Sequence, residues 1–139
     1  MAVYQETLEI RTHRAGTLEI TDELNQILRK SGIVAGMLSV FVQHTSASLI
    51  IMENADPSAR DDLEAYFDRL VPPNEPYFTH TYEGPDDMPS HIKMVLTQTN
   101  QQVPITSGRL ALGTWQGVFL WEHRTSPHRR RLIVTVMGE

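Results

Sequence analysis

Hydrophobic residues near the start of the chain recur with a period of two, which is the pattern of a strand with one buried face. Tyr4, Leu8 and Ile10 share one face of residues 3–10. Residues 16–20 follow after a short turn, and we expect them to pair with 3–10 as a hairpin. Residues 36–43 and 48–52 are short and almost continuously apolar, and this pattern predicts strands that are buried on both faces.

Residues 21–32 carry hydrophobic residues at the three- to four-residue spacing of an amphipathic helix. Thr21 or Asp22 is the expected N-cap, and Gly32 is the expected end of the helix. The expected apolar stripe consists of Leu24, Ile27 and Leu28.

A second helix is predicted over residues 56–70, because Asp56 is a favourable N-cap and Pro57 takes the first helical position. We expect this helix to pack through four apolar positions, Leu63, Tyr66, Phe67 and Leu70. An acidic loop follows over residues 71–87.

A short third helix is predicted over residues 88–96, with Pro89 near its start. Its inward-facing residues are expected to be Ile92, Val95 and Leu96. The remaining apolar runs are predicted to be strands, at 103–105, 109–113, 117–123 and 131–138. This order of elements predicts a single α+β domain over residues 1–139, in which mostly antiparallel strands are covered by two or three helices.

Composition narrows the classes of function. The 139 residues include no cysteine, which excludes disulfides and thiolate chemistry and suits the cytoplasm. We expect no membrane partner, since no apolar run approaches the roughly 18–20 residues of a membrane span. The net charge is −5, with ten acids and two arginines in residues 53–87 but six bases and two acids in residues 88–139. One arginine cluster on an acidic chain indicates a small anion or a subunit contact rather than nucleic acid.

Residues 42–62 hold the densest group of candidate chemical residues. His44, Thr45 and Ser46 follow one predicted strand, and Glu53 and Asn54 follow the next, just before the helix that Asp56 caps. Side chains and backbone N–H groups can converge on a ligand at strand ends and helix N-termini. Each residue alone also fits a turn or a cap, but Glu53 and Asn54 are not needed to start the helix.

His91 is the second candidate, because it lies in the first turn of a predicted helix. The positive end of a helix dipole disfavours imidazolium, and a neutral His91 can donate to an anion or bind a metal ion. An exposed helix-start histidine is the alternative. His80 in the acidic loop is a weaker candidate.

Further along the chain, Gln116 beside Trp115 suits the recognition of an amide or a heterocycle edge, although Trp115 also fits a core position. Arg129 and Arg131 are expected on one face of the last strand and Arg130 on the other. The chain contains no phosphate-binding loop, dinucleotide-binding fingerprint, zinc-protease helix or nucleophile elbow.

Five short motifs together resemble those of the YjbQ-like family, often labelled the secondary thiamine-phosphate synthase family. They are QHTSAS (43–48), ENADP (53–57), DDMPSHIK (86–93), GTWQG (113–117) and the terminal MGE (137–139). The resemblance implies a compact, sandwich-like α+β domain that assembles as a homotrimer with pockets near subunit boundaries. Residues 97–102 differ from the Gly- or Pro-containing turn that we expect in relatives at this position.

The resemblance also implies a pocket that is lined by residues of these motifs. The catalytic residues would be His44, Glu53 and His91, and Glu53 or Asp87 would hold a divalent ion in the enzyme. From their own chemistry, His44 and His91 could be ligands of a metal such as zinc, or could polarise a phosphate without one. The substrate- or anion-binding residues would be Thr45, Ser46, Asn54, Asp87, Trp115, Gln116 and Arg130. The ligand would be a small phosphorylated molecule, and the cofactor would be a divalent metal ion, Mg²⁺ or Zn²⁺.

Two functions follow from this resemblance and from the residues. One is a thiamine-phosphate synthase-type enzyme, which joins a pyrimidine diphosphate to a thiazole phosphate and releases pyrophosphate. The other is a metal- or anion-binding homotrimer in which synthase activity is incidental. A subunit that serves only as an interaction partner is a third alternative.

Overall fold

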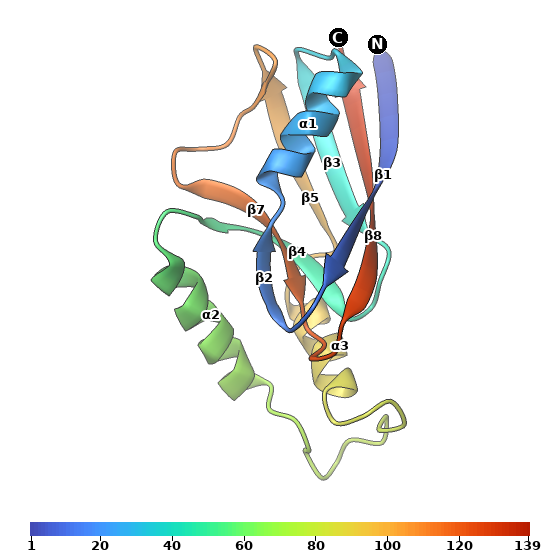
Figure 1. Cartoon of the computed structure of the whole chain (residues 1–139), viewed down its shortest axis with the longest axis vertical. Coiled ribbons are helices and arrows are strands. Elements are labelled where there is room, and N and C mark those ends of the chain that lie inside the picture. Colours follow the sequence, from blue (N-terminus) through green and yellow to red (C-terminus); the bar gives the residue numbers. More distant parts are fainter.

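The computed structural model describes residues 1–139 and has the predicted α+β architecture of three helices and two antiparallel sheets (Figure 1). In chain order the elements are β1 (Ala2–Thr12), β2 (Gly16–Glu19), α1 (Thr21–Ser31), β3 (Gly36–Val42), β4 (Ala47–Glu53), α2 (Pro57–Leu70), α3 (Asp87–Leu96), β5 (Asn100–Thr106), β6 (Arg109–Leu110), β7 (Gln116–Glu122) and β8 (His128–Gly138).

The larger sheet has the strand order β1-β8-β3-β5-β6, and β1 pairs with β8 along its whole length, from Ala2–Gly138 to Thr12–His128. Side chains alternate between a buried face and an outer face that no other element covers. The prediction that 36–43 is buried on both faces was wrong, because β3 alternates in the same way and Phe41 is exposed. An antiparallel sheet can keep one face in water, and this one does.

The smaller sheet has the order β2-β7-β4. The predicted hairpin between residues 3–10 and 16–20 is wrong, because β2 pairs with β7 instead, with Leu18 opposite Leu120. The turn after β1 therefore carries the chain from one sheet to the other. This crossing lets the two sheets enclose one core.

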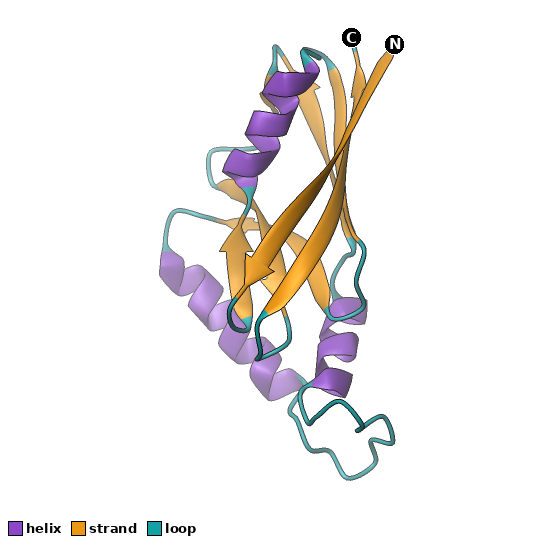
Figure 2. Cartoon of the chain, turned by 45° about the vertical axis from the view of Figure 1, so that its right-hand side comes forward, coloured by secondary structure: helices purple, strands orange, loops and turns teal.

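The core lies between the two sheets, and α1 closes one end of it (Figure 2). The predicted stripe Leu24, Ile27 and Leu28 is fully buried there. Gly32 ends α1 in the left-handed conformation, as predicted. The predicted N-cap was wrong, since no side chain caps α1 and the Thr21 hydroxyl instead accepts a hydrogen bond from the Val118 amide.

The helices α2 and α3 cover the other face of the smaller sheet at the opposite end of the molecule (Figure 2). Asp56 caps α2 by accepting a hydrogen bond from the Ser58 amide, as predicted. Phe67 packs on Trp121 of β7, with ring centroids 4.7 Å apart. The expected packing through Tyr66 and Leu70 was wrong, because these side chains are 63% and 53% exposed.

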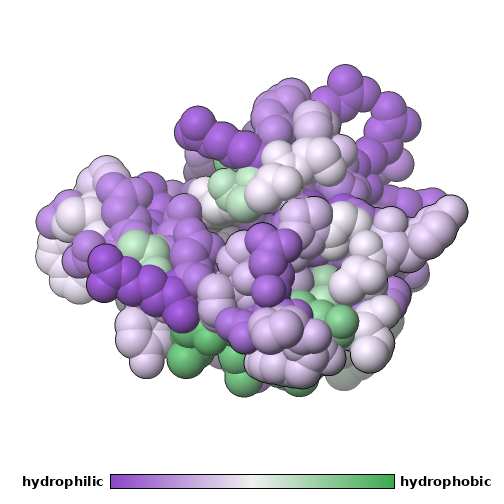
Figure 3. All heavy atoms as spheres, turned by 90° about the horizontal axis from the view of Figure 1, so that it is seen from below, coloured by the Kyte–Doolittle hydropathy of each residue, from purple (hydrophilic) through white to green (hydrophobic).

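The expected packing of α3 was wrong in the same way, since Val95 and Leu96 are exposed and only Ile92 of the three is partly covered. Figure 3 views this end of the molecule and shows hydrophobic side chains gathered along one margin of a mostly hydrophilic surface. None of the three helices is long and apolar enough to cross a membrane.

Candidate metal centre

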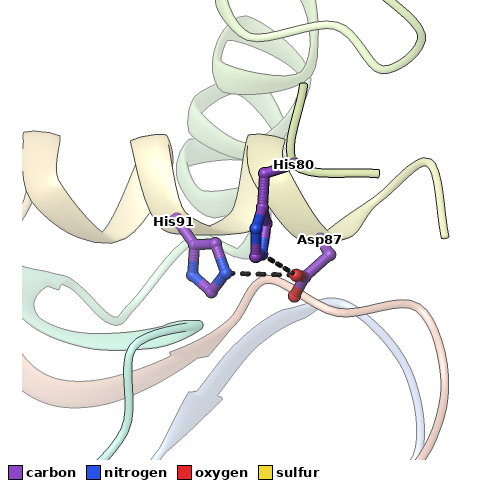
Figure 4. Close-up of side chains that lie close together, drawn as sticks. All are labelled: His80, Asp87 and His91. Atoms are coloured by element: carbon purple, nitrogen blue, oxygen red, sulfur yellow. Dashed lines mark hydrogen bonds and ion pairs between the residues drawn. The ribbon is translucent and has the colours of Figure 1, made fainter. Parts of the chain in front are cut away.

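Three side chains converge where the loop of residues 71–86 enters α3 (Figure 4). Their potential ligand atoms, from His80, Asp87 and His91, all lie within 4.8 Å of one another. Nε2 of His80 lies 2.8 Å from Oδ2 of Asp87, and Nε2 of His91 lies 3.2 Å from the same oxygen. Asp87 and His91 are four residues apart on α3, so they share one helix face. Asp87 is buried and the His80 side chain is 55% exposed, so the cluster opens to solvent on the His80 side.

The hydrogen bond on the other side of the His91 ring fixes its tautomer. Nδ1 of His91 lies 2.6 Å from the carbonyl oxygen of Thr45, which can only accept, so Nδ1 carries the hydrogen. The lone pair of a neutral His91 is then on Nε2 and faces the Asp87 carboxylate. A metal ion between this nitrogen and the carboxylate would bind both groups.

Arg124 holds the carboxylate from its other side. Its Nη1 donates to Oδ1 of Asp87 at 3.0 Å, while its Nε donates to Asp86 at 3.0 Å and its Nη2 donates to the carbonyl of Glu83. The Asp86 carboxylate also accepts from the amide of Thr125. Burial alone would raise the pKa of Asp86, but the hydrogen bonds from Thr125 and Arg124 outweigh it and lower that pKa. Arg124 therefore fixes both the start of α3 and the orientation of Asp87.

Two imidazoles and one carboxylate form a common ligand set for zinc. Bonds of about 2.0–2.1 Å in a tetrahedral site place ligand atoms roughly 3.3 Å apart, which is close to the observed separations from Asp87. Three protein ligands leave a fourth position for water or substrate, as catalytic zinc sites do.

His44, the expected partner of His91, is not part of this cluster. Its Nε2 accepts a hydrogen bond from the backbone amide of Arg131 at 2.9 Å. Burial, with the nearby charge of Arg130, holds the pKa of His44 below its usual value. Its neighbour Thr45 contributes its backbone carbonyl to His91 rather than its hydroxyl.

Arg130 and Ser46 belong to a buried network instead of an open pocket. The guanidinium of Arg130 forms an ion pair with Glu122, donates to the Ser46 hydroxyl at 3.0 Å and is only 2% exposed. Thr12 also donates to Glu122, at 2.6 Å. Burial would raise the pKa of Glu122, but the hydrogen bonds from Arg130 and Thr12 outweigh it and lower that pKa. Arg130 is thus engaged inside the protein by Glu122 and Ser46.

Four other predicted residues gather at the far end of β4, namely Glu53, Asn54, Trp115 and Gln116. Glu53 accepts from the Asp56 amide, and Gln116 accepts from the Gly113 amide. Asn54 donates to Glu19. The seven residues of β4 span about 20 Å, and they separate this group from Ser46 at the other end of the strand. Trp115 is 62% exposed, so the alternative that it is a core residue was wrong.

His80 is the second imidazole of this cluster, although it was the weaker candidate in the sequence. The available signal was a histidine seven residues before Asp87, in a loop that must return to the start of a helix. No periodic pattern predicts the path of such a loop, whereas a position on a helix follows from spacing alone.

Comparison with known proteins agrees with the resemblance of the motifs. The family model described as "UPF0047 protein YjbQ-like" matches residues 6–139. The chain belongs to the YjbQ-like UPF0047 family. A UPF0047 protein of Synechocystis, sll1880, is 50% identical over 98% of this chain and 92% of its own length. The UPF0047 protein YjbQ of Escherichia coli O157:H7 is 47% identical over 98% of this chain and 99% of its own length.

Solved structures of YjbQ-like proteins share the fold. A crystal structure of a YbjQ-like protein of unknown function from Sulfolobus solfataricus P2 superimposes with a TM-score of 0.91 at 27% identity, covering 99% of both chains. A YjbQ/UPF0047 protein of Clostridium acetobutylicum superimposes with a TM-score of 0.84 at 31% identity, covering 96% of this chain and 99% of its own.

Proposed function

We propose that the chain binds a divalent metal ion, with zinc preferred, through His80, Asp87 and His91, and acts there on a small phosphorylated molecule. The observation that carries the proposal is the convergence of these three ligand atoms within 4.8 Å. The fixed tautomer of His91 supports it, because the ring nitrogen that is left free for a metal is the one that faces the cluster.

The specific reaction that we propose is of the thiamine-phosphate synthase type. Release of pyrophosphate from a pyrimidine diphosphate develops negative charge on the leaving oxygen, and a bound divalent ion would neutralise that charge. The protein groups would do little covalent chemistry. Asp87 and the two imidazoles would position the ion, Arg124 would hold Asp87, and solvent access on the His80 side would admit the substrate.

One observation favours the second candidate, a metal-binding protein in which this turnover is incidental. Arg124 is the one guanidinium at the cluster, and it is already bound to Asp86, Asp87 and a backbone carbonyl. It is therefore not free to hold the substrate phosphates. An assay of pyrophosphate release decides between the two candidates, provided that the metal site is established first.

Calorimetric titration of zinc into chelator-treated protein tests the metal site. We expect one zinc per chain in the wild type, and loss of that binding in H80A, D87N and H91A. H44A is the matched control, since the His44 Nε2 is occupied by the Arg131 amide, and it should bind zinc like the wild type. Zinc binding that is lost in H44A but kept in H80A would overturn this ligand set and support the His44–His91 pair.

Pyrophosphate release from the pyrimidine diphosphate, measured with and without the thiazole phosphate, then tests the reaction. We expect release that requires zinc and falls at least about a hundredfold in H91A, the loss typical of removing an electrostatic catalytic group. Zinc binding without any turnover would support the second candidate.

A further inference from the structure

Arg11 on β1 and Arg129 on β8 lie directly opposite each other in the pairing of the two strands. Both side chains are exposed on the outer face of the larger sheet, and neither takes part in an ion pair. Like charges that face each other across an antiparallel pair are destabilising. The fold thus keeps two repelling guanidinium groups side by side at the end of its longest strand pair.

The two arginines line a surface hollow of about 430 Å³ together with His13, Pro127 and His128, and no acidic side chain lines it. We call Arg11, His13, His128 and Arg129 the basic cluster. His128 is held in place by a hydrogen bond between its Nδ1 and the Ser126 carbonyl, which leaves its Nε2 without a protein partner. The guanidinium groups of Arg11 and Arg129 and the imidazole of His13 can therefore donate to an anion in a space that no acidic side chain lines, whereas a neutral His128 ring with its hydrogen on Nδ1 presents only a lone pair at Nε2.

The nearby carboxylates are engaged elsewhere or lie outside the hollow. Glu9, two residues before Arg11, lies opposite Arg131. Glu122 is bound by Arg130, and Glu64 accepts from the amide and hydroxyl of Thr17. Glu64 and Asp61 line a different cavity, of about 340 Å³, on the other side of Arg11. That cavity is also lined by Arg11, Arg14 and Arg60, but its three carboxylates repel an anion. The hollow between Arg11 and Arg129 has no acidic lining residue and is therefore the more favourable position.

We infer that the basic cluster is a second ligand site, separate from the proposed metal centre, which binds a small phosphorylated anion of the diphosphate class. Arg11 and Arg129 would each donate to phosphate oxygens from opposite sides, and guanidinium groups suit such paired donation. The flanking acids and the chain's net charge of −5 confine the site to one small anion, since a nucleic-acid strand would need a longer basic surface.

Titration of sodium pyrophosphate into chelator-treated protein at low salt tests this site in the absence of a metal ion. We expect binding in the wild type, and a loss of about tenfold or more in R11Q and in R129Q, because each removes charge-assisted hydrogen bonds. R131Q is the matched control, since Arg131 lies on the same face of β8 but opposite Glu9, and its affinity should stay within about twofold.

A thermal melt gives a second readout that a purely structural arginine would not produce. Without pyrophosphate, R129Q should melt at a higher temperature than the wild type, because the facing repulsion is gone. Pyrophosphate should raise the melting temperature of the wild type clearly more than that of R129Q at the same concentration. Equal pyrophosphate affinity in wild type and the R11Q/R129Q double variant, or no binding at millimolar pyrophosphate, would overturn the inference. Without a metal ion, H91A should bind pyrophosphate like the wild type, because His91 belongs only to the proposed metal centre. The experiment can therefore contradict the basic cluster without contradicting the metal centre, and the reverse.

Discussion

The role of each histidine depends on the hydrogen-bond partner of its ring nitrogens. His91 donates to the Thr45 carbonyl and so presents its free nitrogen to Asp87, whereas His44 uses a ring nitrogen to accept from Arg131. The sequence predicted His91 in one pocket with His44 and placed Asp87, a predicted ligand-binding residue, in the loop before the helix of residues 88–96. Asp87 is instead the first residue of α3 and shares a helix face with His91. The sequence did not predict that His80 lies beside His91, since that depends on the path of the loop over residues 71–86.

The buried residue His123 contributes to the loss of folding stability in acid, and this contribution can be measured. Its ring is buried against Trp121 and its Nε2 bonds the Ser48 hydroxyl at 2.8 Å. Burial, with the charge of Lys93 next, lowers the pKa of His123 from 6.5 to about 3. Between pH 6.5 and about 3, His123 is protonated in the unfolded chain but stays neutral in the native protein. Stability is therefore present above the unfolded pKa and is lost as the pH falls below it, by up to about 1.4 kcal/mol per pH unit for this one group.

Urea unfolding of wild type and H123Q between neutrality and about pH 5 checks this slope. H123Q keeps a side chain that can bond Ser48 but does not titrate, so its stability should fall less steeply with acid. Because other groups, including His44, titrate equally in both proteins, the difference between the two slopes isolates His123. Parallel curves would show that His123 is not held neutral by burial.

At the scale of elements, hydrophobic periodicity predicted the existence of all three helices but not how deeply each one packs. The stripe of α1 lies in the core, whereas α2 has no fully buried residue although its apolar positions repeat just as regularly. A hydrophobic period of 3.6 residues shows which face of a helix is apolar, but it does not show which element covers that face. The pairing of β2 with β7 was not predicted for a related reason. The short turn between β1 and β2 permits a hairpin of these two strands but does not require one.

Paired leucine substitutions measure this difference between helices. Leu24 of α1 is fully buried and Leu70 of α2 is 53% exposed. L24A should lower the free energy of unfolding by about 2–5 kcal/mol, the range for a buried leucine that leaves a cavity. L70A should lower it by less than about 1 kcal/mol, since little apolar surface returns to water. Denaturant unfolding of both variants gives the comparison, and a larger loss in L70A would mean that α2 is covered by something outside the single chain.

At the scale of the whole molecule, the larger sheet ends in an apolar patch on its uncovered face. Val3, Met137 and Met37 lie in register across β1, β8 and β3, and Val3 is 63% exposed. The backbones beneath this patch approach closely, because Gly36 faces Gly138 and a Cβ on either residue would overlap the opposite strand. The patch lies at the opposite end of β1 and β8 from the basic cluster.

We expect this patch to be the contact between subunits of the homotrimer that the family resemblance implies. Sedimentation equilibrium should give a mass of about 47 kDa, three times the 15.8 kDa of one chain. A V3E/M137E double variant should sediment as a monomer, because assembly would bury two carboxylates in an apolar contact without partners. L70E is the matched control, since it places the same charge on the exposed apolar surface of α2, and it should remain trimeric. A trimer that survives V3E/M137E but is lost in L70E would move the subunit contact to the α2 and α3 end, and a monomeric wild type would remove the trimer altogether.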